Sequence, residues 1–88
     1  MACEPLSYSG VDASKWPSVQ DAVSREYGIL IASDRGEASK RGFKLKWTYE
    51  PSAQTLRIQC LSKPFFVPCE TVNNRIKRTA EELGLTSV

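Results

Sequence analysis

The sequence predicts an α+β protein, a two-layer sandwich in which two helices pack on one face of a three-stranded antiparallel sheet. Two observations support this fold class. Residues 43–60 alternate between apolar and polar side chains, as the strands of a β-hairpin do, and the segments at 15–27 and 69–83 repeat apolar residues at helical spacing. The predicted order of elements is therefore α-β-β-β-α. A chain of 88 residues accommodates one domain of this kind.

We assign residues 15–88 to this domain and residues 1–14 to an irregular N-terminal arm, because the opening stretch is rich in proline, serine and glycine. Leu6, Tyr8 and Val11 are the residues through which the arm would contact the core. The first helix is predicted over residues 15–27, where apolar residues recur at steps of three and four: Trp16, Val19, Val23 and Tyr27. Its candidate caps are Ser14 or Ser18 at the start and Gly28 at the end.

Two segments of contrasting composition follow the first helix. Residues 29–32 form a short apolar run rich in β-branched residues and predict a buried strand. Residues 34–42 contain two glycines and five charged residues, so they predict a surface loop.

A hairpin is the strongest structural signal in the chain. Its strands cover about residues 43–50 and 55–60, and residues 51–54 form the connecting loop. One register keeps the apolar residues of both strands on the same face, pairing Tyr49 with Leu56, Trp47 with Ile58 and Leu45 with Cys60. A shift of one residue would place Trp47 against a polar side chain and expose half of the apolar face. The hairpin therefore has a core face that includes Trp47 and a polar face in water.

The chain ends in a connector and a second helix. Residues 64–67 begin with Pro64 and are followed by Pro68. They predict either a short fourth strand at the sheet edge or a packed connector. The second helix is predicted over about residues 69–83, ahead of Gly84. Its apolar stripe is Cys69, Val72, Ile76, Ala80 and Leu83.

The composition argues against catalysis. The chain has no histidine, which removes the commonest general base and the commonest zinc ligand. Its three cysteines lack the spacing of a structural zinc site, and its glycines lack the spacing of a phosphate-binding loop. We therefore expect no catalytic residues, no metal and no cofactor, and a protein that is not an enzyme.

Cys69 is the one residue with reactive potential, because a thiolate at the start of a helix is stabilised by the helix dipole. Its position on the apolar stripe favours a buried core residue instead. Pairing with Cys60 is geometrically conceivable. However, the odd number of cysteines and the lack of a signal peptide or membrane span predict a cytoplasmic protein without a permanent disulfide.

The candidate binding surface combines basic residues on the polar face of the hairpin with residues that follow its second strand. Its members are Lys44, Lys46, Arg57, Leu61, Lys63, Phe65 and Phe66. Adjacent residues of an extended segment point in opposite directions, so we expect one of the two phenylalanines to be exposed. Such a mixed patch favours a small protein-interaction or assembly module that binds itself or an acidic protein.

The alternative hypothesis is a nucleic-acid-binding domain that uses the basic sheet face. The net charge is +2 and is unevenly distributed, at −1 for residues 1–42 and +3 for residues 43–88. The pI of about 8.5 is below the value above 9 that dedicated nucleic-acid binders usually have. The polar face of the hairpin also has no aromatic residue on which a base could stack. A membrane partner is not expected.

The α-β-β-β-α order resembles that of the double-stranded RNA binding domain, in topology and not in sequence. That family contacts phosphates through a run of lysines at the start of its last helix. The corresponding residues of this chain are Pro68, Cys69, Glu70 and Thr71. The resemblance therefore implies no RNA site at this helix.

Overall fold

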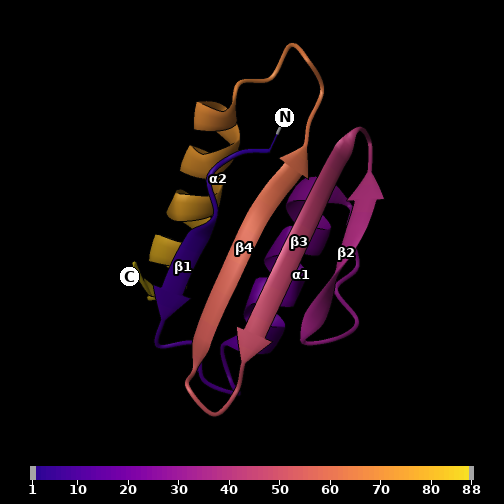
Figure 1. Ribbon diagram of the computed structural model, residues 1–88. Coiled ribbons are helices and arrows are strands. Elements are labelled where there is room, and N and C mark those ends of the chain that lie inside the picture. Colours follow the sequence, from indigo (N-terminus) through magenta and orange to yellow (C-terminus); the bar gives the residue numbers. More distant parts are fainter. Residues whose placement is uncertain (1, 88) are drawn as a thin grey trace.

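The computed structural model describes residues 2–87, within which the chain forms two helices and one five-stranded antiparallel sheet. The elements in chain order are β1 (Leu6–Ser9), α1 (Trp16–Tyr27), β2 (Arg35–Lys40), β3 (Phe43–Glu50), β4 (Thr55–Ser62), α2 (Cys69–Glu82) and β5 (Thr86–Ser87). The strands are arranged in the order β2-β3-β4-β1-β5. Both helices lie behind the sheet in Figure 1, so the fold has two layers and one uncovered sheet face. The α+β class is confirmed, but the predicted three strands are too few.

The central hairpin has the predicted register. Trp47 lies opposite Ile58 and Tyr49 lies opposite Leu56, while Leu45 lies opposite Cys60. These six residues are at most 4% exposed, so the apolar face of the hairpin forms the sheet side of the core. The indole of Trp47 also donates a hydrogen bond of 3.0 Å from Nε1 to the carbonyl of Ser33. The hairpin forms because burial on one face and water on the other permit only this pairing.

The predicted loop at residues 34–42 is wrong, because most of this segment forms the edge strand β2. Its turn to β3 places Arg41 and Gly42 at φ of 57° and 85°, which is the backbone of a tight hairpin turn. Gly36 lies opposite Trp47, and a Cβ atom there would come within 3.2 Å of the indole. Charged residues of β2 lie on the face that is in water. Gly36 lies on the inner face, where the Trp47 ring leaves little room for a side chain.

Two further strands extend the sheet on its other side. β1 lies within the segment predicted to be irregular, and it pairs with β4 so that Tyr8 faces Leu56. The two-residue strand β5 then pairs with β1. Tyr8 and Val11 are buried and Leu6 packs against the core, as predicted for the N-terminal arm. With β1 and β5 the element order is β-α-β-β-β-α-β, which differs from that of the double-stranded RNA binding domain.

Residues 29–32 form no strand, and only Ile29 and Ile31 of the predicted buried run are buried. Ile29 and Ile31 point into the core at 1% and 3% exposure, whereas Leu30 is 76% exposed. The segment lies beneath the sheet with no neighbouring strand. Its Ile31 carbonyl accepts a hydrogen bond of 3.0 Å from the Gln20 side chain instead. A side chain thus provides one of the hydrogen bonds that a neighbouring strand would have provided to this backbone.

Both helices begin and end close to the predicted residues. α1 ends at Gly28, whose φ of 69° confirms the predicted C-terminal cap. At its start neither predicted serine is the cap: Lys15 occupies the N-cap position without a side-chain hydrogen bond, and the Asp12 carboxylate accepts the backbone N–H groups of Ser14 and Lys15 in the preceding turn at 3.0 and 2.9 Å. These hydrogen bonds hold the pKa of Asp12 below its ordinary value, with the Ser14 hydroxyl contributing most.

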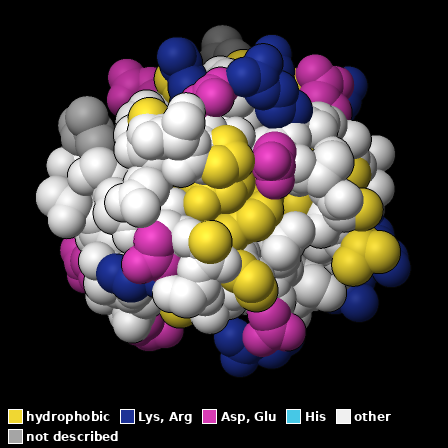
Figure 2. Space-filling view, turned by 90° about the horizontal axis from the view of Figure 1, so that it is seen from below, with side chains coloured by type: hydrophobic (Ala, Val, Ile, Leu, Met, Phe, Trp, Pro, Cys, Tyr) yellow, Lys and Arg dark blue, Asp and Glu magenta, His cyan; other side chains and the backbone are white. Residues whose placement is uncertain are grey.

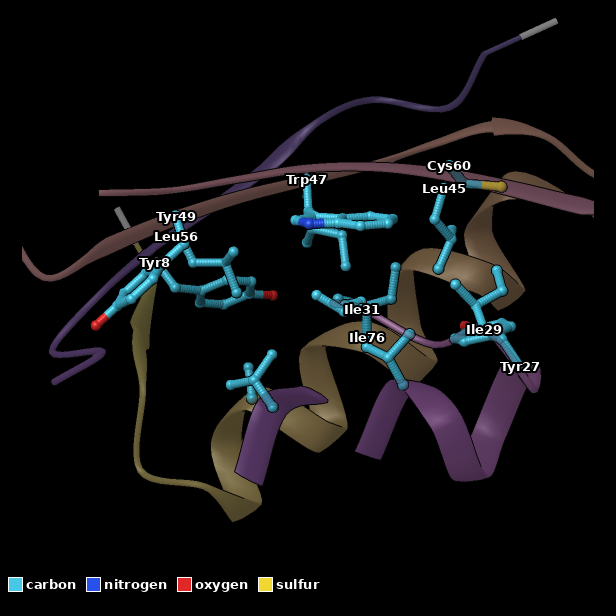
Figure 3. Packing of buried hydrophobic residues seen from close by; sticks show 14 of the residues in the cluster. Tyr8, Tyr27, Ile29, Ile31, Leu45, Trp47, Tyr49, Leu56, Cys60 and Ile76 are labelled. Carbon is cyan, nitrogen blue, oxygen red and sulfur yellow. The ribbon is translucent and has the colours of Figure 1, made fainter. Parts of the chain in front are cut away.

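The core lies between the sheet and the two helices. Figure 3 shows Trp47, Tyr49 and Leu45 from the sheet facing Ile76 of α2 and Tyr27 of α1. Of the predicted stripe of α2, Val72, Ile76 and Ala80 are buried, whereas Cys69 and Leu83 are partly buried against the core. Tyr49 stacks on Trp16 with ring centroids 4.4 Å apart and donates a hydrogen bond of 2.7 Å to the Val11 carbonyl. The central strand, the first helix and the N-terminal segment therefore meet at Tyr49.

Candidate functional site

The polar face of the sheet carries a shallow hollow of about 240 Å³ lined by four side chains, Lys46, Thr48, Arg57 and Gln59. These residues alternate outward on β3 and β4, where Thr48 lies opposite Arg57 and Lys46 opposite Gln59. The predicted basic residues Lys46 and Arg57 are therefore brought together, on the face that the helices leave uncovered (Figure 1). Among the described residues, neither forms an ion pair.

The edge strand β2 brings the acidic residue Glu37 to the same face, which the sequence did not reveal because this segment was predicted to be a loop. Glu37 lies next to β3 and accepts an ion pair of 3.5 Å from Lys44. Arg35 of β2 likewise pairs with Glu50 of β3. Both pairs are exposed and contribute little to stability. The two pairs lower the charge of the face. Of its cations Arg35, Lys44, Lys46 and Arg57, the last two have no carboxylate partner within residues 2–87.

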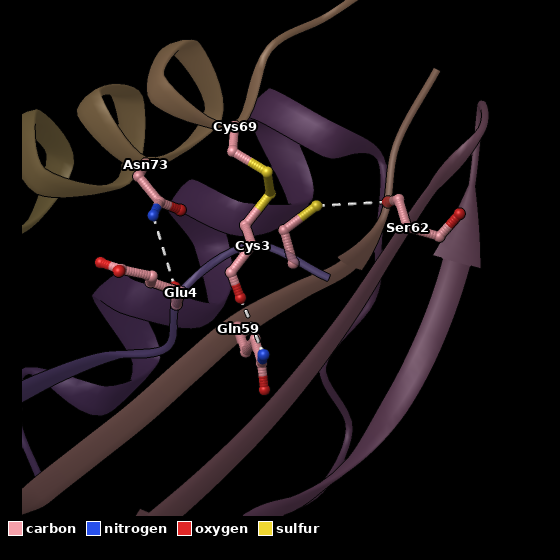
Figure 4. Close-up of a disulfide and its surroundings, with 7 residues drawn as sticks. Cys3, Glu4, Gln59, Ser62, Cys69 and Asn73 are labelled. Atoms are coloured by element: carbon pink, nitrogen blue, oxygen red, sulfur yellow. Dashed lines mark hydrogen bonds between the residues drawn. A yellow bond between two sulfur atoms is a disulfide. The ribbon is translucent and has the colours of Figure 1, made fainter. Parts of the chain in front are cut away.

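The side chain of Gln59 already has a hydrogen-bond partner. Its amide Nε2 donates a hydrogen bond of 2.8 Å to the carbonyl of Cys3, in the segment before β1 (Figure 4). The hollow therefore offers two cations and the Thr48 hydroxyl to an anionic group. It lacks the aromatic residues with which sheet surfaces usually hold single-stranded nucleic acid.

The connector after β4 forms a turn rather than the possible fourth strand, with the Val67 amide donating 3.0 Å to the Pro64 carbonyl. This turn carries both phenylalanines outward: Phe65 is 95% exposed and Phe66 is 73% exposed. Their rings make an edge-to-face contact with centroids 5.6 Å apart. The expectation that only one is exposed is wrong, because a turn, unlike a strand, can present successive side chains on the same side.

The base of this turn is packed against a neighbouring turn. A Cβ atom on Gly42, in the turn between β2 and β3, would lie 3.1 Å from the Pro64 ring. Leu61 and Lys63, also predicted for the surface, are half-buried. The predicted surface is therefore divided into two parts. Lys46 and Arg57 lie in the hollow of the sheet, whereas Phe65 and Phe66 lie in the turn that continues from the end of β4.

Cys69 is neither a free nucleophile nor a partner of Cys60, because it forms a disulfide with Cys3 (Figure 4). The two Cα atoms are 5.4 Å apart, within the usual range for this bond. The prediction that the protein has no permanent disulfide is therefore wrong. Cys60 keeps a thiol, which is fully buried and donates to the carbonyl of Ser62 at 3.2 Å. Burial raises the pKa of this thiol, so it is a poor nucleophile.

The two helices leave a narrow crevice above the core. Its lining is apolar and includes Val19 and Val23 of α1, Ile76 and Ala80 of α2, and Tyr8 of the sheet, and it holds only about 40 Å³. Figure 2, which views the molecule from below, shows apolar side chains gathered near the centre of that face among charged ones. The crevice is far smaller than the several hundred Å³ of a pocket for a drug-sized ligand. We therefore interpret it as a small packing gap between the helices of the core.

Comparison with protein-family models, with curated proteins and with solved structures gives no match for this chain. Neither described helix is long and apolar enough to span a membrane. Within residues 2–87, no group of three or more cysteine, aspartate or glutamate side chains is placed to hold a metal ion.

Proposed function

We propose that the protein is a small non-enzymatic interaction module whose contact surface is the turn carrying Phe65 and Phe66. The observation that supports this is the exposure of both rings, at 95% and 73%, although two phenylalanines are among the most costly residues to leave in water. Exposed aromatic residues are typical of the centres of protein interfaces. Their mutual ring contact and the prolines at 64 and 68 restrict the turn before binding, which lowers the entropy lost in a complex.

The surroundings of the rings favour either a second copy of the chain or a partner with an acidic surface. Lys63 immediately precedes the turn and is partly exposed. Lys40 and Arg41 are close by in sequence to Gly42, but their side chains pack over Gly28 at the C-terminal end of α1, where the helix dipole favours cations. Lys63 is therefore the cation best placed to contact a carboxylate beside the two rings.

Self-association is tested first, by sedimentation velocity at two protein concentrations. We expect a concentration-dependent dimer that is lost in the double variant Phe65→Ser, Phe66→Ser. Leu30→Ser is the matched control, because Leu30 is another large apolar residue with 76% exposure but lies in the segment after α1. If the control variant also loses the dimer, general surface hydrophobicity rather than this turn is responsible.

A monomer at both concentrations excludes the homodimer and directs the test to a different protein. The wild type and both variants then serve as baits for proteins from the source cells. A partner retained by the wild type and by Leu30→Ser, but lost from the double variant, supports the proposal. A partner retained equally by all three proteins contradicts it.

The second candidate function is nucleic-acid binding on the sheet face, supported by Lys46 and Arg57, which line the hollow without ion partners among the described residues. A mobility-shift assay at low salt with mixed-sequence single-stranded DNA and RNA tests it. Binding that weakens with salt and with the variant Lys46→Gln, Arg57→Gln supports this function. No shift at low salt excludes it.

The cytoplasmic location stays a prediction, and the Cys3–Cys69 disulfide is an argument against it. Disulfides persist in oxidising compartments and are rare in the reducing cytosol. Rapid alkylation of the protein in its own cells, followed by mass spectrometry, distinguishes the two settings. Cys3 and Cys69 recovered with alkyl groups would indicate a reducing compartment, and recovery as the disulfide an oxidising one.

A further inference from the structure

The uncovered face of the sheet is positively charged around its hollow of about 240 Å³. Charged side chains occupy outward positions on the described strands β2, β3 and β4. The cations are Arg35, Lys44, Lys46 and Arg57, and the carboxylates are Glu37 and Glu50. Four cations and two carboxylates leave an excess of two positive charges. The two cations that line the hollow, Lys46 and Arg57, are also the two without an ion pair among the described residues.

Arg57 lies between two residues that carry hydroxyl groups. The strand register places Thr48 of β3 opposite it on one side and Ser7 of β1 opposite it on the other. Directly opposite residues are the nearest cross-strand neighbours on a sheet, with Cβ atoms about 4.5–5.5 Å apart. The guanidinium therefore has hydroxyl groups, and no carboxylate, directly across from it on both neighbouring strands.

Lys46 is the diagonal neighbour of Arg57, because Lys46 lies opposite Gln59 and Arg57 lies opposite Thr48. Diagonal neighbours have a separation of about 7–8 Å, which long side chains can bridge. On the other side Lys46 lies opposite Glu37 of β2, but that carboxylate pairs with Lys44 at 3.5 Å. Two like charges are thus held close together at one hollow, and an anion bound between them would remove their repulsion.

We infer that this hollow binds the phosphoryl group of a small phosphomonoester. Such a group carries about −1.5 to −2 charges at pH 7 and three strong acceptor oxygens. Arg57 offers paired N–H donors, Lys46 an ammonium group and Thr48 a hydroxyl. Three donor groups with two charges therefore meet three oxygens with nearly two charges. A phosphodiester or a carboxylate has a single charge and two such oxygens, and would leave one donor group and one charge unmatched.

The hollow recognises the phosphoryl group and contributes little to the binding of the rest of the ligand. It is shallow, and its four lining side chains include no aromatic or aliphatic residue against which an organic group could pack. Gln59 is held by its hydrogen bond of 2.8 Å to the Cys3 carbonyl (Figure 4). The volume is also below the roughly 300–1,000 Å³ of pockets that enclose a drug-sized molecule. The organic part of the ligand therefore stays in water.

This inference does not depend on the turn that carries Phe65 and Phe66. It concerns the same hollow as the second candidate function, but it requires one isolated phosphoryl group and not a polyanion. Saturation by a phosphomonoester and a mobility shift of a nucleic acid are separate measurements. Failure of either one is therefore distinguishable from failure of the other.

Titration with methyl phosphate and with dimethyl phosphate at constant ionic strength, followed by amide chemical shifts in NMR, tests the inference. We expect saturable shifts centred on Lys46, Thr48 and Arg57 at millimolar methyl phosphate. Dimethyl phosphate has one charge and one acceptor oxygen fewer, so it should bind about tenfold more weakly. Equal binding of the two compounds would overturn the assignment of a phosphomonoester site and would leave the nucleic-acid hypothesis to its own assay.

Substitutions of the two cations locate the site. Lys46→Gln and Arg57→Gln should each weaken methyl phosphate binding about fivefold or more. Lys77→Gln and Arg78→Gln are the matched controls, because they make the same changes at exposed positions of α2, which lies in the other layer and does not line the hollow. All four positions are exposed, and the NMR spectrum of each variant shows whether it is folded. The inference is overturned if methyl phosphate produces no saturable shifts, or if the α2 variants weaken binding as much as the variants of the hollow.

Discussion

Cys3 and Cys69 are joined by a disulfide that fastens the N-terminal segment to the first residue of α2, across a sequence separation of 66 residues. The same segment is also attached to the sheet, because the Cys3 amide donates a hydrogen bond of 2.8 Å to the Cys60 carbonyl of β4. A third contact of 3.3 Å runs from the Asn73 side chain to the Glu4 carbonyl (Figure 4). The N-terminal segment thus connects the sheet to α2 and closes one end of the core.

Reduction of this disulfide should destabilise the protein. A cross-link that closes a loop of this length restricts the unfolded chain, and its removal typically costs about 2–5 kcal/mol in a small domain. Urea unfolding with and without a reducing agent measures the difference. The variant Cys3→Ser, Cys69→Ser should be as unstable as the reduced wild type and should not respond to the reductant. An equal midpoint for oxidised and reduced wild type would contradict the role of this bond.

The Cys60 thiol should react slowly in the native protein. It is fully buried and its pKa is raised above the ordinary value of 9.0, chiefly by desolvation. Iodoacetamide at mildly alkaline pH should therefore add at most a trace of one alkyl group to the native oxidised protein. Unfolding in denaturant without reductant should give complete single alkylation. Rapid single alkylation of the native oxidised protein would contradict the burial of the Cys60 thiol.

Removing the hydroxyl groups of two buried tyrosines should have opposite consequences. Tyr49→Phe deletes a hydrogen bond of 2.7 Å to the Val11 carbonyl and leaves that carbonyl unpaired, which should cost about 1–3 kcal/mol. Tyr27→Phe deletes a hydroxyl that has no partner among the described residues, so it should leave the free energy of unfolding unchanged or raise it. Urea unfolding of the two variants in parallel makes the comparison. An equal loss of stability in both would refute the difference in hydrogen bonding.

Stability should fall at alkaline pH, and Tyr27 should account for part of the fall. Its pKa is raised from 10.0 to about 12, with desolvation as the largest cause. Because the unfolded phenol ionises first, the contribution of Tyr27 to stability is complete below about pH 10 and is lost as pH rises towards 12. Burial also raises the pKa of Tyr8 and Tyr49, so the wild type should lose stability over a similar range.

Urea unfolding from about one pH unit below the ordinary tyrosine pKa of roughly 10 to about two units above it measures this loss, which should be smaller in Tyr27→Phe than in the wild type. Tyrosinate absorbance of the native protein provides a direct check. Ionisation of all three tyrosines at their ordinary pKa in the folded protein would contradict the assigned environments.

The sequence predicted the pairing of the central hairpin from Leu45 to Cys60 because both of its faces carry a strong signal, but not the register shift that pairs Lys44 with Ser62. Every inward position of the two strands is apolar, so only one register buries Trp47 against Ile58. The edge strand β2 gave no such signal, since its inward positions include Gly36 and Ala38. Glycine suits position 36 because the Trp47 ring lies over it, 3.2 Å from where a Cβ atom would be. That contact involves residues that are 11 positions apart in the chain.

The candidate surface was predicted residue by residue but not in its arrangement. Lys46 and Arg57 lie together as expected from the hairpin register. Lys44 does not add to their charge, because Glu37 from the unpredicted strand pairs with it. The joint exposure of Phe65 and Phe66 depends on a turn between two prolines, whose geometry is not set by alternation along the chain.

The sequence by itself determined the α+β class, the two helices and the central hairpin, because periodic burial is a local property that three or four neighbouring residues already express. Only the tertiary structure decided the outer strands, the pairing of Cys3 with Cys69 and the burial of the Tyr27 hydroxyl. Each of these depends on which distant segments come within a few ångströms of one another. That proximity results from the packing of the whole core and has no counterpart in any single stretch of sequence.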